Sequence, residues 1–98
     1  MALDDAQQDI ILRHATRLLS SRDYPKTICP SEIARALSEE ELQALHATDW
    51  RDTMDDIRQV VWEKRGAGEV EVMQKGEVID VESLKDIRGP IRVRLVKK

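Results

Sequence analysis

The hydrophobic pattern of this chain changes its period near Gly66. Up to about residue 64 the apolar side chains recur every three or four positions, which places them on one face of a helix. From residue 70 to residue 95 apolar and polar side chains alternate instead, as they do on half-buried strands. A chain of 98 residues divided in this way predicts a single α+β domain, with helices first and a small antiparallel sheet last.

The helical part divides into three main helices and one short helical piece. Proline and capping side chains mark the boundaries, because proline disfavours helical geometry in the residue before it and a serine side chain can cap the next helix. The predicted helices cover residues 4–22, a second helix opened by Pro30 and capped by Ser31, residues 42–45 after the capping box of Ser38–Glu41, and residues 48–64. Trp50, Met54, Ile57 and Val61 form the expected core stripe of the last helix, and the three glutamates of the capping-box segment are expected to be solvated.

The alternating part predicts a hairpin and a final strand. Lys75-Gly76 supplies a turn between the run at Val70 and the run at 77–79. Residues 91–95 then place Ile91, Val93 and Leu95 on the apolar face and Arg92 and Arg94 on the wet face. With a short strand over 26–29, the order is typical of a winged helix-turn-helix domain spanning residues 1–98, with its core at about 5–96.

Four segments are characteristic in combination: KTICPSEIARAL at 26–37, WRDTM at 50–54, GEVEVMQKG at 68–76 and GPIRVRL at 89–95. Together they resemble a bacterial family of short winged-helix proteins described only as a domain of unknown function. The resemblance covers about residues 5–96. It implies a winged-helix fold, and it implies no activity.

Charge is distributed unevenly along the chain. The formal net charge is −3, but residues 85–98 hold six basic residues and one acidic residue, whereas the remainder holds 10 basic and 18 acidic residues. A basic end on an acidic body is typical of a phosphate-binding edge. The alternative is that the basic strand rests on the acidic body of its own molecule.

The third long helix and the hairpin carry the side chains suited to DNA. Arginine can read guanine, glutamine can read adenine, and lysine or arginine can neutralise phosphates. The candidate contacts to double-stranded DNA are Arg51, Arg58, Gln59, Arg65, Lys75, Arg88, Arg92 and Arg94. This protein is thus expected to be a DNA-binding domain, with a possible role in transcriptional regulation, that contacts DNA through its hairpin wing and C-terminal strand.

Several features favour other readings of the same side chains. Residues 50–63 hold two arginines against four acids, and Asp55 is spaced to pair with Arg51 or Arg58. Arg92 and Arg94 can pair with Glu69 and Glu71 across the sheet. Trp62 can pack half-buried against the sheet, or stack on Arg58 or on a partner. The alternative function is therefore a protein-interaction or homodimerisation module that binds no nucleic acid.

The sequence offers no support for catalysis, a metal or a cofactor. Cys29 is the only cysteine, which excludes an intrachain disulfide and agrees with a reducing compartment. His14 and His46 lie in no motif that predicts contact with Cys29, and a half-buried cysteine is expected there. The acidic start of the chain lacks the features of a signal peptide, and no segment is apolar enough to span a membrane. We expect a cytoplasmic protein that is not an enzyme.

Overall fold

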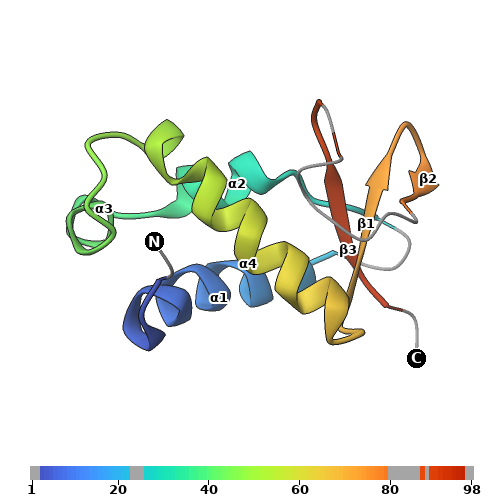
Figure 1. Ribbon diagram of the computed structural model, residues 1–98, viewed down its shortest axis with the longest axis horizontal. Helices are drawn as coiled ribbons and strands as arrows, with labels where there is room; N and C mark the ends of the chain where they lie inside the picture. The colour runs from blue at the N-terminus through green and yellow to red at the C-terminus, as the bar shows by residue number, and fades with distance from the viewer. Residues whose placement is uncertain (1–2, 23–25, 80–86, 88, 97–98) are drawn as a thin grey trace.

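The computed structural model describes residues 3–22, 26–79, 87 and 89–96. Helices and a small sheet follow one another along the chain, and the α+β class is confirmed (Figure 1). The elements are α1 (Asp5–Ser20), α2 (Pro30–Ala36), α3 (Glu39–Ala44), the 3-10 helix η1 (Trp50–Thr53), α4 (Met54–Gly66), β1 (Val70–Gln74), β2 (Glu77–Val78) and β3 (Arg92–Leu95). Among the described residues, every helix is too short or too polar to span a bilayer.

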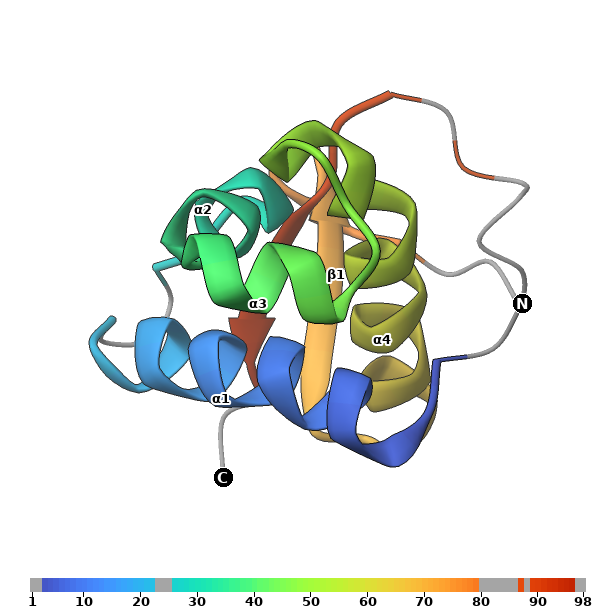
Figure 2. The same ribbon diagram turned by 90° about the vertical axis from the view of Figure 1, so that its left-hand side faces the viewer.

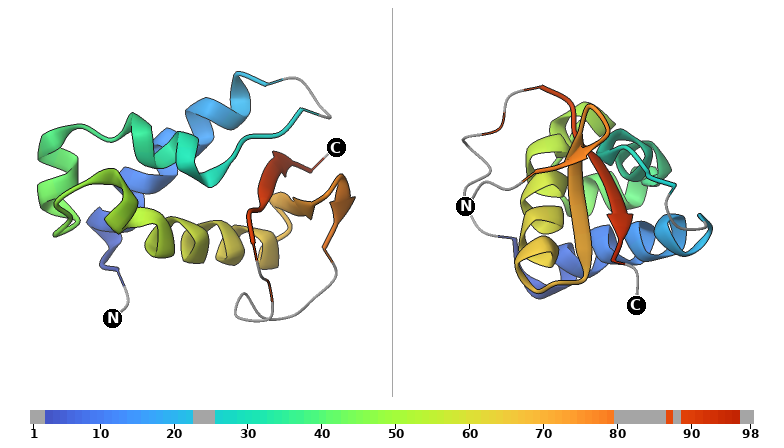
Figure 3. Two further views of the ribbon diagram at one scale, coloured as in Figure 1. Left: turned by 90° about the horizontal axis from the view of Figure 1, so that it is seen from above. Right: turned by 90° about the vertical axis from the view of Figure 1, so that its right-hand side faces the viewer.

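The sheet is antiparallel, with strand order β2-β1-β3. Val72 of β1 pairs with Val93 of β3, and both side chains are fully buried. Figure 3 shows β1 and β3 side by side, with the helices covering one face. On its other side β3 meets Ile28, which exchanges two backbone hydrogen bonds of 2.7 and 2.8 Å with Val93. The predicted strand at 26–29 is therefore reduced to one bridging residue, because α2 begins two residues later.

The core lies between α1, α2, α4 and the sheet. Each of these three helices contributes a fully buried isoleucine to the core: Ile11, Ile33 and Ile57. The predicted stripe of α4 is confirmed in part: Ile57 and Val61 are buried, while Trp50 and Met54 are half-buried against the core. The prediction missed Val60, which is 3% exposed. The chain begins this region as a 3-10 turn, so a stripe drawn for one continuous α-helix is rotated at its start.

Leu95, which the sequence predicts on the apolar face of its strand, is 42% exposed. It lies on the inner face of the sheet beside a hollow of about 290 Å³ between α1 and α4. Leu12 and Leu19 of α1 and Val61 of α4 line the same hollow. The helices diverge here, so the end of β3 is left incompletely covered.

The beginnings of the helices correct two boundaries. The N-cap of α2 is Cys29 and not Ser31, because Glu32 folds back to accept the N–H of Cys29 at 2.7 Å. Ser31 lies inside the helix and donates its hydroxyl to the sulfur of Cys29 at 3.1 Å. The capping box of Ser38 and Glu41 is confirmed, but α3 begins at Glu39, three residues before the predicted piece.

Glu41 also ties α3 to α1, so the expectation that all three glutamates are solvated is wrong for this one. In the view of Figure 2, α3 lies between α1 and α2. The Nε2 of His14 donates to Glu41 Oε1 at 2.9 Å, while His14 Nδ1 accepts from Arg17 Nη2 at 3.1 Å. A guanidinium can only donate, so these two bonds require the His14 proton on Nε2.

Glu41 makes the free energy of unfolding depend on pH in the acidic range. The pKa of Glu41 is lowered from its ordinary value of 4.5, chiefly by the backbone N–H of Ser38 and further by His14, while burial opposes the shift. A lowered pKa in the folded state means that the stability contributed by the carboxylate is complete above about 4.5 and is lost as the pH falls through the lowered value.

We therefore expect Glu41→Gln to be less stable than the wild type near neutral pH, and the difference to shrink below pH 4.5, where a protonated glutamate resembles glutamine. Urea unfolding across this range measures it, with the exposed neighbour Glu40→Gln as control. A difference for Glu41→Gln that is unchanged by acid would contradict the assignment.

Candidate nucleic-acid interface

Two arginines on one flank of α4, Arg58 and Arg65, donate hydrogen bonds to backbone carbonyl groups outside the helix. Arg65 Nη2 donates to the carbonyl of Ile79 at 3.1 Å, and Arg58 Nη2 makes a long hydrogen bond of 3.5 Å to the carbonyl of Gly89. Arg51 pairs with Asp49 at 3.3 Å rather than with Asp55. Two of the candidate DNA contacts, Arg58 and Arg65, are thus bound to backbone carbonyl groups of their own molecule.

Trp62 lies on the same flank. It is half-buried and packs against the core, and the guanidinium carbon of Arg65 lies 4.4 Å from the centre of its ring. Arg65, rather than Arg58, therefore stacks on Trp62. A cation over an indole ring is ordered by this contact, so Arg65 is fixed by two interactions within its own molecule.

The outward face of α4 is acidic. Gln59 is exposed there, beside a hollow of about 360 Å³ that Asp55, Asp56 and Glu63 also line. Leu3 and Gln8, at the start of α1, close its other side. A DNA phosphate that approached Gln59 would meet these carboxylates first, so this face opposes insertion of α4 into a groove.

Lys75 lies at the tip of the β1–β2 hairpin. The register Gln74↔Glu77 leaves Lys75 and Gly76 as a two-residue loop, and both have positive φ, at +52° and +82°. Positive φ at both positions gives a turn that matches the twist of the strands, and the predicted turn is confirmed. Lys75 is exposed, and no residue of the described ranges pairs with its ammonium group.

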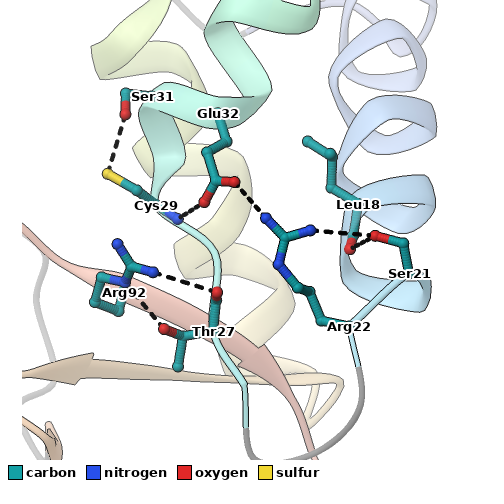
Figure 4. A network of polar contacts seen from close by, with 8 residues as sticks. All are labelled: Leu18, Ser21, Arg22, Thr27, Cys29, Ser31, Glu32 and Arg92. Atoms are coloured by element: carbon teal, nitrogen blue, oxygen red, sulfur yellow. Dashed lines mark hydrogen bonds and ion pairs between the residues drawn. The ribbon is translucent and has the colours of Figure 1, made fainter.

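The two arginines of β3 have different surroundings. Arg92 is exposed and donates to Thr27 Oγ1 at 2.9 Å and to the Thr27 carbonyl at 3.3 Å (Figure 4). The Arg94 side chain is only 14% exposed, and its Nε lies 2.9 Å from Glu71 Oε1 on β1. The predicted cross-strand pair is confirmed for Arg94 alone, since Glu69 pairs with Lys64 at 3.0 Å. Arg88, also a candidate contact, lies outside the described residues.

A family model described as "Protein of unknown function (DUF3253)" matches residues 8–96. The chain belongs to the DUF3253 family. The resemblance to a domain of unknown function is therefore confirmed over nearly the whole of the described fold. No curated protein matches the chain.

The start of α2 in this DUF3253 domain is bound to the segment that follows α1. Arg22 Nη2 lies 2.6 Å from Glu32 Oε1, and Glu32 also holds the backbone N–H of Cys29 (Figure 4). Cys29 is half-buried, as expected, and its sulfur accepts from the Ser31 hydroxyl. A neutral hydroxyl donor does not activate a thiol as a nucleophile. In the described ranges of the chain, no three His, Cys, Asp or Glu side chains gather as a metal site would require.

Sequence reasoning missed one cluster of the DUF3253 domain, formed by Arg35, Trp50 and Arg51. The helical period predicts Trp50 as a core residue, yet its ring is half-buried and the guanidinium groups of Arg35 and Arg51 stack on it. Arg35 belongs to α2, so only the packing of α2 against η1 brings it to this ring. The adjacency of Trp50 and Arg51 was the one signal available in the sequence.

The pair formed by Glu71 and Arg94 gives a prediction for this DUF3253 domain. Arg94→Glu would face two carboxylates across paired strands at a partly buried position, so we expect a loss of about 1–3 kcal/mol in the free energy of unfolding. The exchanged variant, Glu71→Arg with Arg94→Glu, restores opposite charges and is expected to recover most of the loss. Chemical unfolding measures both, and a double variant no more stable than Arg94→Glu alone would contradict this account.

Proposed function

We propose that this DUF3253 domain is a winged helix-turn-helix that binds double-stranded DNA, mainly through phosphates, with the β1–β2 hairpin as its wing. The observation that carries the proposal is the position of Lys75, an exposed lysine at the tip of a tight hairpin that follows helices α2 and α4. In winged helices a helix of this order lies on the duplex and the hairpin touches its backbone or minor groove.

The charges of the described residues favour one mode of contact over another. The outward face of α4 is acidic around Gln59, whereas Lys75 and Arg92 are exposed cations on the sheet. Arg94 is largely buried on Glu71 and contributes to the strand pairing instead. We therefore place the main phosphate contacts on Lys75 and Arg92, and we expect weak binding with little dependence on base sequence, as for other phosphate-dominated complexes.

Fluorescence anisotropy of a labelled duplex of mixed sequence tests the proposal. We expect binding in the micromolar range at about 50 mM salt, with a steep loss of affinity at about 200 mM salt, because each neutralised phosphate releases counterions. A single-stranded probe of the same sequence is the control for duplex geometry. Absence of any binding at the lower salt concentration would overturn the proposal.

A second candidate function is a protein-interaction or homodimerisation module that binds no nucleic acid. The acidic outward face of α4 favours it, together with Val78 and Leu95, which are 47% and 42% exposed. Sedimentation velocity over a range of protein concentrations tests self-association. A dimer that fails to bind the duplex would favour this function over the first, and a monomer at every concentration would exclude homodimerisation.

A further inference from the structure

Two guanidinium groups from different helices lie over one tryptophan ring. The guanidinium carbon of Arg35, in the last turn of α2, lies 5.0 Å from the ring centre of Trp50, and that of Arg51 lies 4.6 Å from it. The two cations are therefore within about 10 Å of each other. Trp50 packs half-buried against the core, whereas both arginines are exposed, so the ring is a fixed support on which two exposed side chains stack.

The acidic residues beside this cluster are directed toward the backbone. Asp49 Oδ1 accepts the N–H of Arg51 at 2.7 Å. Asp52 Oδ2 accepts the N–H groups of Thr48 and Asp49, at 3.1 and 3.3 Å. These carboxylates cap η1. Their capping role accounts for their position next to the arginines, so no bound ligand is needed to explain it.

The arginines themselves keep donors available. Asp49 Oδ2 pairs with Arg51 Nη1 at 3.3 Å, but both side chains are exposed, at 47% and 70%, and an exposed pair of this kind contributes little and exchanges readily. No carboxylate within the described ranges pairs with Arg35. A guanidinium that stacks on a ring by its face still presents N–H groups along its edge, and that planar fork matches phosphate oxygens.

The start of α4, which directly follows η1, shares an edge of the molecule with the β1–β2 hairpin. In Figure 1 the start of α4 and the β1–β2 turn both lie along the upper edge, at opposite ends of it. The start of α4 and the start of β3 also lie at the upper edge in Figure 2. A duplex lying along this edge would therefore meet the start of α4, which directly follows η1, at one end and the β1–β2 hairpin at the other.

We infer that Arg35 and Arg51, held over Trp50, form a clamp for phosphates of the DNA backbone, separate from the contacts of the wing. The inference rests on the proposed function and adds a second site of contact to it. Both arginines bind phosphate, and Trp50 is a positioning residue that lowers the conformational entropy lost when they do so.

Salt-dependent anisotropy titrations with the mixed-sequence duplex test the clamp. We expect Arg35→Ala and Arg51→Ala each to weaken binding about 10-fold at low salt and to reduce the slope of log affinity against log salt by about 0.9, the value for one phosphate contact. Arg13→Ala is the matched control, because Arg13 is a 66% exposed arginine on α1 that pairs with Asp9. It changes the net charge equally, and we expect less than a twofold effect.

Trp50 is tested by variants that keep every charge. Trp50→Leu is expected to weaken binding several-fold and to leave the salt slope unchanged, since both arginines remain but lose their support. Trp50→Phe, which retains a ring and more of the core packing, should show a smaller effect and serves where the leucine variant does not fold. A Trp50 series with wild-type affinity would overturn the positioning role.

The outcomes separate the clamp from the proposed function. If the wild type binds and Lys75→Glu loses affinity, while Arg35→Ala and Arg51→Ala behave like Arg13→Ala, the clamp is wrong and the wing contact stands. If the wild type binds no duplex at low salt, the clamp and the proposed DNA-binding function are both wrong. If Arg35→Ala and Arg51→Ala lose affinity and slope while the wing variant does not, the clamp stands and the wing contact is wrong.

Discussion

Replacing Ile57 by alanine is expected to lower the free energy of unfolding by about 2–5 kcal/mol, the usual range for truncating a buried isoleucine. Ile57 is 0% exposed and lies in the core cluster on the inner face of α4. The variant loses the transfer free energy of the removed methyl and methylene groups and leaves a cavity that the surrounding helices fill only in part. A domain of this size is stable by only about 5–15 kcal/mol, so a large share of its stability would be lost.

Urea unfolding followed by circular dichroism measures this change. The matched control is Val78→Ala, which removes aliphatic groups from a side chain that is 47% exposed on the two-residue strand β2. We expect the control to stay within about 0.5 kcal/mol of the wild type. An Ile57→Ala protein as stable as the control would show that α4 does not pack as described.

Reversing the charges of Lys75 and Arg92 is expected to produce the largest change in DNA binding. Lys75→Glu with Arg92→Glu replaces two exposed cations by anions that repel the backbone, and we expect the affinity for a mixed duplex to fall on the order of 100-fold at low salt. Each single variant should account for a part of the loss, because both contacts act through phosphates and not through one shared base.

Arg13→Glu is the control for net charge, since it equals either single reversal in charge and lies on α1. Anisotropy measures affinity, and a thermal melt of each variant is needed because Arg92 also holds Thr27. Single reversals at Lys75 and Arg92 that weaken binding no more than Arg13→Glu does would show that the hairpin and β3 are not the contact surface.

The elements that the sequence predicted well are those whose signals are local. The Lys75-Gly76 turn, the capping box of Ser38 and the end of α4 near Gly66 each depend on residues within a few positions of one another. The boundaries were less certain where two local signals compete. At the start of α2 either Cys29 or Ser31 precedes a suitable first turn, and the return of Glu32 to the Cys29 N–H decides between them.

The candidate interface was harder to predict because its side chains depend on contacts between distant segments. Arg58 and Arg65 lie on one flank of α4, as the helical period predicts, but their partners at Gly89 and Ile79 come from elsewhere in the chain. The helical period shows which way a side chain points from its own helix, and it says nothing about what lies opposite. For the same reason Arg35 was not recognised as a neighbour of Trp50.

The position of β3 in the sheet has a consequence for how the protein folds. Val93 is paired on one side with Ile28 and on the other with Val72, and the side chains of Thr27 and Arg92 join segments 65 positions apart. Closing a loop of that length lowers the entropy of the chain, and this loss comes before the new contacts can offset it with favourable free energy. The hairpin of β1 and β2 can form early because its strands are joined by a two-residue turn. Ile28, in contrast, can pair with Val93 only after β3 has taken its place in the sheet. The joining of β3 to both neighbours is therefore expected to be the slow, rate-limiting step of folding, and during synthesis the buried residues of α1 and α2 would stay accessible to chaperones until it occurs.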